Sequence, residues 1–228
     1  MILNRIMDDI IIPTYIINVS QNLNCFETIL SQFEGKDEFD IKIFSVAEEQ
    51  TEDLMYWNAV RNVIEAAIYN DEDVILICDE NHVFTSFYTK EQLISSIYEA
   101  HRLQASILLG GVNGDFRNLL PLKSGISWLE AFSQSNFIII FQSLYEKFLN
   151  ESFCSTDNFF QKLSSLTSNK FVMFPPISRF NQDNIKYKYE DASLQLFLRN
   201  SLESSIARIN KIHEIYHNIC LNGGKNSS

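Results

Sequence analysis

The order of apolar and polar positions predicts alternating strands and helices in the first half of the chain. Short apolar runs rich in β-branched residues alternate with segments whose apolar residues recur every three or four positions. The runs are typical of buried strands, and the spacing is typical of amphipathic helices. The expected strands are Ile10–Asn18, Ile41–Val46, Val74–Cys78 and Ala105–Leu109. The expected helices are Leu23–Phe33, a stripe from Trp57 to Ile68, and a helix opened by Thr89.

The second half of the chain continues this pattern less regularly. It predicts strands at Phe137–Phe141 and Phe171–Phe174, a helix over Asp157–Leu166, and a long helix over Ala192–His217. Alternation of this kind predicts an α/β fold: a Rossmann-like, mainly parallel, twisted sheet with helices on both faces. The strand Val74–Cys78 is apolar at every position, so we expect it at the buried centre of the sheet.

The length of 228 residues fits one α/β domain with an appended helix. We expect the domain to cover residues 1–190 and the C-terminal helix residues 191–220, with a flexible tail at 221–228. The apolar stripe of the helix must be buried, either on its own domain or against a second copy in a homodimer. His213 and Tyr216 carry polar tips, which favours a homodimer contact for the second half of the helix.

Composition and charge exclude several classes of partner. The chain is 46% apolar and 21% charged, as in folded globular proteins, and its net charge is -11. Lysines and arginines are scattered, so the sequence predicts no basic face and no nucleic-acid partner. A nucleoside diphosphate sugar is still compatible with this charge, because a divalent metal or backbone amides can neutralise its diphosphate.

The cysteines and the N-terminal residues indicate a cytoplasmic protein. The four cysteines are far apart and do not have zinc-site spacing, which suggests free thiols in a reducing compartment. Asp8 and Asp9 precede the first apolar run, where a secretory signal would be cationic and then apolar. No stretch approaches the ~20 apolar residues of a transmembrane helix.

The segment after the strand Val74–Cys78 is the sharpest chemical feature. If the chain stays extended there, Asp79 and Asn81 point the same way and offer two oxygen ligands to Mn²⁺ or Mg²⁺. The alternative is a polar turn that ends the strand, with the following His82 in a solvated loop. Gly110 and Gly111 follow the next strand, where they would allow close approach to a sugar or phosphate, or form an ordinary turn.

Three segments together resemble glycosyltransferases with the GT-A fold, of the lipooligosaccharide galactosyltransferase type. They are the strand and acidic segment Ile75–Phe84, the opening Tyr15–Asn18, and the preceding helix with Trp57 and Asn58. The resemblance covers roughly residues 12–178. The acidic motif of this family is Glu-Asp-Asp, whereas this sequence has Asp79 in place of the first Glu and Asn81 in place of the final Asp. Basic residues that usually follow the first strand in the family are absent from Val19–Asn22. We therefore expect metal binding to be weak or lost.

The resemblance implies transfer of a hexose from a nucleoside diphosphate sugar to a hydroxyl of a saccharide acceptor, with inversion. It implies that Ile17, Asn18 and Val19 contact the nucleotide and that Glu80, Gly110 and Gly111 contact the rest of the substrate. It also implies that Asp79 and Asn81 hold Mn²⁺ or Mg²⁺. Asp157 would be the general base. The residues alone favour Asp157 as the cap of the helix that follows it. The alternative for the whole protein is a catalytically degenerate member of this fold that acts as a binding or scaffold module.

Overall fold

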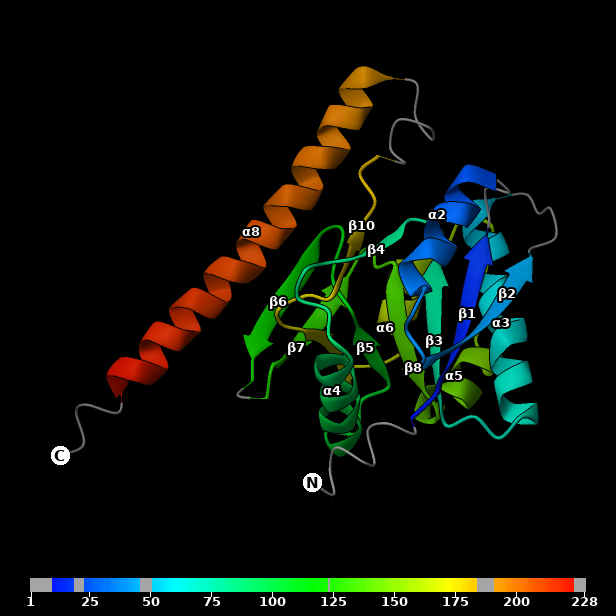
Figure 1. The fold of residues 1–228 in the computed structure, drawn as a ribbon, viewed down its shortest axis with the longest axis horizontal. Coiled ribbons are helices and arrows are strands. Elements are labelled where there is room, and N and C mark those ends of the chain that lie inside the picture. Colours follow the sequence, from blue (N-terminus) through cyan, green and yellow to red (C-terminus); the bar gives the residue numbers. More distant parts are fainter. Residues whose placement is uncertain (1–9, 19–22, 46–50, 123, 184–190, 224–228) are drawn as a thin grey trace.

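The computed structural model describes residues 10–18, 23–45, 51–122, 124–183 and 191–223. These residues form an eight-stranded sheet of order β2-β1-β3-β8-β5-β9-β7-β6, and a two-stranded sheet of β10 and β4 (Figure 1). The large sheet contains β1 (Ile12–Asn18), β2 (Phe39–Ser45), β3 (Val74–Asp79), β5 (Ile107–Leu109), β6 (Phe116–Pro121), β7 (Ile126–Phe132), β8 (Phe137–Phe141) and β9 (Lys170–Met173). The small sheet pairs β4 (His82–Phe84) with β10 (Ser178–Phe180). In the large sheet β7 and β8 run against the other six strands, so it is mixed and mainly parallel.

Helices cover both faces of the large sheet. They are α2 (Leu23–Phe33), α3 (Glu52–Tyr69), α4 (Lys90–Arg102), the short 3-10 turn η1 (Gln142–Leu144), α5 (Tyr145–Asn150), α6 (Phe159–Ser165) and α8 (Ala192–Gly223). The core on one face is built by α3, α5 and α6, and the core on the other face by α2 and α4. No helix of the described residues is long and apolar enough to cross a membrane.

Strand β3 shows why the sequence pattern locates the centre of the sheet. Ile75 and Ile77 belong to the core under α3, whereas Leu76 and Cys78 belong to the core under α2 and α4. Successive side chains of a strand point to opposite faces, so a strand covered on both faces is apolar throughout. The predicted α/β class, the mainly parallel sheet and the buried central strand are confirmed.

Helix starts follow local capping chemistry. The hydroxyls of Thr51 and Thr89 accept hydrogen bonds of 3.2 and 3.1 Å from the amides of Leu54 and Gln92, which opens α3 and α4. The predicted bounds of α2 are confirmed. The pattern missed β4, β6, β7 and β10, because these strands are short or carry polar residues on an exposed side.

The C-terminal helix α8 packs along the β6 side of its own sheet (Figure 1). The hydroxyl of Ser205 donates to the carbonyl of Gly114 at 2.8 Å, and Arg208 donates to the carbonyl of Phe116 at 2.9 Å. The guanidinium of Arg208 also lies 4.2 Å from the centre of the Phe116 ring, a cation–π contact. The helix extends to Gly223, beyond the predicted bound, and residues 224–228 of the expected tail lie outside the described residues.

His213 corrects one part of the homodimer prediction. Its ring stacks on Phe174 with a centroid distance of 3.4 Å, and its Nε2 lies 2.8 Å from the hydroxyl of Ser127. The polar tip is therefore used within the chain, because Phe174 and β7 supply both a flat partner and a hydroxyl. Ile215 and Ile219 on the same helix are exposed. A homodimer through this end of α8 stays a prediction.

Candidate functional site at the carboxyl ends of β1 and β3

The order of strands places a topological switch point between β1 and β3. The chain leaves β1 through α2 on one face to reach β2, then returns through α3 on the other face to reach β3. Connections that diverge in this way leave a crevice at the carboxyl ends of the two strands, where α/β proteins bind ligands. Ile17 and Asp79 are register partners at this end of the strands. The acidic segment predicted from the sequence therefore lies at the switch point.

Asp79 ends β3 and shapes the turn that follows. Its Oδ1 accepts a hydrogen bond of 2.6 Å from the amide of Asn81, which closes a turn between β3 and β4. Aspartate side chains commonly close turns through an amide two residues on. The prediction that Asp79 and Asn81 lie on one face of an extended segment is thus wrong, and the alternative of a polar turn is confirmed.

A buried network of amide side chains joins Asp79 to two later segments. Asn136 Nδ2 donates to Asp79 Oδ1 at 2.8 Å, and the Asn136 carbonyl accepts from the Asp79 amide at 3.2 Å. Asn113 Nδ2 in turn donates to Asn136 Oδ1, while Asn113 Oδ1 accepts from the Phe180 amide at 3.0 Å. All three polar side chains are buried, so their mutual hydrogen bonds satisfy groups that water does not reach.

Tyr56 connects this turn to the α6 side of the sheet. Its pKa is raised well above the usual value by burial and by the negative charges of Asp79 and Glu80. Its hydroxyl is buried and has no hydrogen-bond partner of normal geometry among the described residues. The Tyr56 ring lies 5.1 Å from the ring of Phe159 at the start of α6. A buried tyrosine hydroxyl usually has a hydrogen-bond partner, so this one is available as a donor to a ligand.

Asp157 lies in the loop before α6. Its Oδ2 accepts from the Cys154 amide at 2.9 Å and lies 3.7 Å from Lys162 Nζ. The helix begins at Phe159, and its cap is Asn158, whose side chain accepts from Gln161 at 3.1 Å. The prediction that Asp157 caps this helix is therefore wrong, and its carboxylate is left half-buried at the surface.

Asp53 brings the start of α6 to the start of α3. Its carboxylate accepts from the Phe159 amide at 2.8 Å and from Asn158 at 3.2 Å. Helix α3 follows β2, so its first turn lies at the same end of the sheet as Asp79. The loop with Asp157 therefore lies at the same end of the sheet as Asp79, while the hydrogen bond and ion pair of Asp157 are to residues around α6. Its role as general base stays a prediction.

Gly110 and Gly111 are explained by contacts within the chain. A Cβ at Gly110 would lie 2.7 Å from the ring of Phe137, and one at Gly111 would collide with the carbonyl oxygen of Ser178. The amides of Ile177 and Ser178 also donate to the Gly110 carbonyl at 2.8 and 3.1 Å. Because these glycines lack a Cβ, their backbone can lie directly against the segment that leads into β10. Substrate contacts at these two positions stay a prediction.

The remaining predicted contacts lie on β1. Ile17 is fully buried in the core under α3, so its backbone rather than its side chain is available at the strand end. Asn18 is the last residue of β1, although its side chain is not described. Val19 lies outside the described residues.

Metal binding by Asp79 and Asn81 stays a prediction. The described residues contain no group of three metal-binding side chains, and Oδ1 of Asp79 already accepts two hydrogen bonds. Mg²⁺ and Mn²⁺ need several oxygen ligands, which one or two carboxylates supply only together with substrate phosphates and water. Asp79 and Asn81 would therefore hold an ion only together with a diphosphate and water, if they hold one as the resemblance implies.

His82 is more buried than its sequence context suggested. It is wholly buried between Phe84 and Phe137, and its Nδ1 lies 2.8 Å from the hydroxyl of Ser178. Burial, with a smaller effect of Lys36, lowers the pKa of His82 to about 3, so the imidazole is neutral. The expectation of a solvated loop histidine is wrong, because His82 belongs to β4, which pairs with β10, and aromatic rings pack against its imidazole.

Comparison with known proteins gives only distant similarity. No protein family matches the sequence, and no curated protein matches it. One similar solved structure is an apo UDP-glucose pyrophosphorylase, at 9% identity and a TM-score of 0.42, which covers 75% of this chain and 76% of that one. Another is a glycosyltransferase involved in glycosylation of the major capsid of PBCV-1, at 12% identity and a TM-score of 0.43, over 72% of this chain and 82% of that one. Identity and TM-score are both low, so these similarities assign no activity to the chain.

Proposed function

We propose that the protein binds a nucleoside diphosphate sugar at the carboxyl ends of β1 and β3 and transfers the sugar to a hydroxyl of a saccharide acceptor. The observation that supports this most is the position of Asp79, which ends the central strand at the switch point opposite Ile17. The motif resemblance in Ile75–Phe84 and Tyr15–Asn18 falls on the same two strands. Sequence motif and topology therefore indicate one site.

Asp157 is proposed as the general base of the transfer. In this step the acceptor oxygen forms a bond to the anomeric carbon, and the bond from that carbon to the diphosphate breaks. The diphosphate leaves with the electron pair, and Asp157 takes the acceptor proton. The choice rests on accessibility: Asp157 is half-buried in a surface loop, whereas Oδ1 of Asp79 is held by Asn81 and Asn136. A base must reach the hydroxyl within hydrogen-bonding distance.

A second candidate function is a non-catalytic binding module. It is favoured by one observation: the Asp79 side chain organises the chain's own turn and its network with Asn136 and Asn113. Such a protein would bind the same donor or a partner without turning it over. The two candidates differ in turnover and share the binding site.

Thermal unfolding with a panel of nucleotide sugars tests both. Ligands that bind only the native state raise its apparent stability by about 2.7 kcal/mol at a concentration 100-fold above Kd. The panel contains UDP-, GDP-, dTDP- and CMP-sugars, each beside its free nucleotide. Stabilisation by one family of nucleotide sugars, followed by release of the nucleotide when saccharides are added, supports the transferase. Stabilisation without turnover favours the binding module, and no stabilisation by any member of the panel contradicts both.

A further inference from the structure

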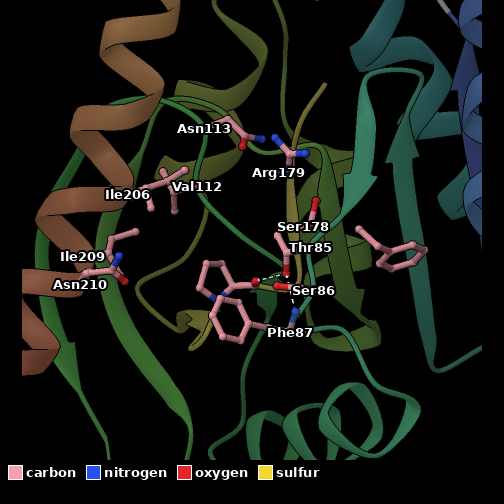
Figure 2. Close-up of a pocket in the computed structure, with 12 residues that line it drawn as sticks. Thr85, Ser86, Phe87, Val112, Asn113, Ser178, Arg179, Ile206, Ile209 and Asn210 are labelled. Carbon is pink, nitrogen blue, oxygen red and sulfur yellow. Dashed lines mark hydrogen bonds between the residues drawn. The ribbon is translucent and has the colours of Figure 1, made fainter. Parts of the chain in front are cut away.

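A cavity of about 440 Å³ lies between α8 and the small sheet of β4 and β10 (Figure 2). It is enclosed by four segments far apart in the sequence: residues 84–87, 112–113, 176–179 and 206–210. Its size is in the range of small-molecule sites, which are usually largely preformed. None of the residues assigned above to donor binding or catalysis lines it.

The wall opposite α8 is held rigidly. The Thr85 hydroxyl donates to the Pro176 carbonyl at 2.7 Å and accepts from the Phe87 amide at 3.2 Å (Figure 2). The Thr85 amide also donates to the Ile177 carbonyl at 2.9 Å. These bonds fix the backbone that carries Phe87, whose side chain is 54% exposed. An aromatic ring displayed by a fixed backbone offers a flat apolar surface at low entropic cost.

The lining is divided into an apolar and a polar part. Val112, Ile206 and Ile209 supply aliphatic surface, with Phe87 on the opposite wall. Asn113 and Arg179 lie at one end of the cavity in Figure 2, and the hydrogen bond from the Phe180 amide to Asn113 holds them together. A ring with one apolar face and a hydroxylated edge fits such a lining, because each part meets groups of its own polarity.

Arg179 gives the cavity its charge. Within the described part of the chain its guanidinium has neither an ion pair nor a hydrogen bond, and the residues that line the cavity include no carboxylate. A planar guanidinium binds carboxylate and phosphate groups through two parallel hydrogen bonds. The cavity therefore favours a ligand with one anionic group.

Asn113 also connects the cavity to the site at the switch point. One side of this residue lines the cavity, and its Nδ2 donates to Asn136, the residue that bonds Asp79. Only two buried side chains thus separate the cavity wall from the turn that ends β3. A ligand in the cavity lies beside the proposed donor site rather than in it.

We propose that this cavity is the acceptor subsite and that it takes an anionic saccharide, with the anionic group on Arg179 and a sugar ring against Phe87 and Ile209. The assignment of the ligand as an acceptor rests on the proposed transferase function. The preference for an acidic saccharide rests on the cavity alone.

The test compares binding of small saccharides to the full chain by ligand-observed NMR. The probes are glucuronate and N-acetylneuraminate as carboxylates, glucose 6-phosphate as a phosphate, and methyl glucoside as the neutral control. We expect the acidic probes to bind more tightly than methyl glucoside, and the carboxylate and phosphate arms to show which anion Arg179 prefers. Arg179→Gln should weaken them about tenfold, the loss expected for a bidentate charged pair.

The control is Lys211→Gln, which removes the same charge from the neighbouring exposed surface of α8, where the lysine pairs with Glu214. It should bind the acidic probes as the unmodified chain does. Arg179 is exposed, so thermal melting should show that its variant stays folded. Equal binding of neutral and acidic probes, no binding of any probe, or equal affinity in Arg179→Gln would overturn the subsite.

Thermal shift by nucleotide sugars is measured in the same variants, and Arg179→Gln should leave it unchanged. Acidic saccharides that bind in an Arg179-dependent manner without any nucleotide-sugar shift would support the cavity as a ligand site and contradict the transferase. A nucleotide-sugar shift without saccharide binding would leave the transferase standing and overturn the subsite.

Discussion

Asn136 donates a 2.8 Å hydrogen bond from its side-chain amide to the carboxylate of Asp79, 57 residues earlier in the chain. Both residues are buried, at 1% and 9% exposure. Asn136 precedes β8, which runs antiparallel to β3, so its position at the carboxyl end of β3 follows from that pairing. The bond joins the acidic turn to the centre of the sheet.

Asn136→Ala should lower the free energy of unfolding by about 3 kcal/mol, because it removes two buried hydrogen bonds at once, the one to the Asp79 carboxylate and the one from Asn113 Nδ2. Urea denaturation measures this loss. Asn200→Ala changes an exposed asparagine on α8 and should alter stability by less than about 0.5 kcal/mol. Equal small effects of the two variants would show that water replaces the network without cost.

Asp157→Asn should reduce the transfer rate about 10²- to 10⁴-fold, the range for loss of a general base, while nucleotide-sugar binding is kept. Single-turnover kinetics and the thermal shift measure the two effects separately. Asp183→Asn removes an exposed carboxylate from another loop and should leave both unchanged. A normal rate in Asp157→Asn would exclude this residue as the base.

Metal dependence should appear only together with the nucleotide. Because the described residues lack three ligand groups, Mn²⁺ alone should not raise the melting temperature, whereas it should increase the shift caused by a nucleotide sugar. Asn81→Asp adds a carboxylate beside the turn and should enlarge this increase. The measurement is thermal unfolding with Mn²⁺, nucleotide sugar, both or neither. A shift by Mn²⁺ alone would instead indicate a resident ion, and a lack of any metal effect in both proteins would contradict the prediction.

The stacking of His213 on Phe174 should make stability depend on pH. Burial lowers the pKa of His213 to about 4, below the usual value of about 6.5. The unfolded chain therefore takes up a proton first, so this contribution to stability is complete above pH 6.5 and decreases as the pH falls towards 4. The loss between pH 7.5 and 5.0 should be about 1 kcal/mol, allowing for partial exposure.

His213→Phe keeps a flat ring on Phe174 and removes the titrating group. Urea denaturation at both pH values should show a smaller difference in this variant than in the unmodified chain. His217→Phe is the control, because His217 is exposed further along the same helix. An equal pH dependence in all three proteins would assign it to other groups, His82 among them.

Gly111→Ala should cost about 1–3 kcal/mol, because its Cβ would meet the backbone carbonyl of Ser178, which cannot move without displacing β10. Gly35→Ala provides the comparison: Gly35 has a φ of +73° with open space around it, so only the backbone preference is lost. Thermal and urea denaturation of the two variants measure the costs. Additional loss of saccharide binding in Gly111→Ala would follow from movement of Ser178 and Arg179.

Local sequence patterns predicted the strands that are buried along their whole length and the helices whose buried side chains recur at regular spacing. Strand β3 and helix α2 were predicted within one residue, since one is apolar throughout and the other has a regular stripe. Strands β6 and β7 were missed, because β6 is buried only at its ends, Phe116 and Pro121, and carries the polar Arg117 and Asn118 next to each other between them. Their pairing depends on contacts that no local pattern records.

The candidate site likewise contains features that a local sequence pattern indicates and features that depend on long-range contacts. Asp79 was found because it interrupts an apolar strand, a feature visible in the sequence alone. Asn136 and the cavity were not found, since both depend on an antiparallel strand and on the path of a helix from the far end of the chain. Asn113 lies two residues after Gly111, but its partners lie 23 and 67 residues away, so no local pattern indicates its role.

The packing of α8 has a consequence for synthesis of the protein. Ile209 belongs to the core that also contains Tyr15 and Ile17, so the first strand and the last helix share one hydrophobic centre. While the chain is still on the ribosome, Phe116 lacks its cation–π partner Arg208, and the cavity lacks the wall formed by Ile206 and Ile209. Until α8 has been synthesised, the β6 side of the sheet lacks the helix that packs on it. The cavity therefore takes shape only after residues 206–210 have been synthesised, later than the three segments that form its other walls.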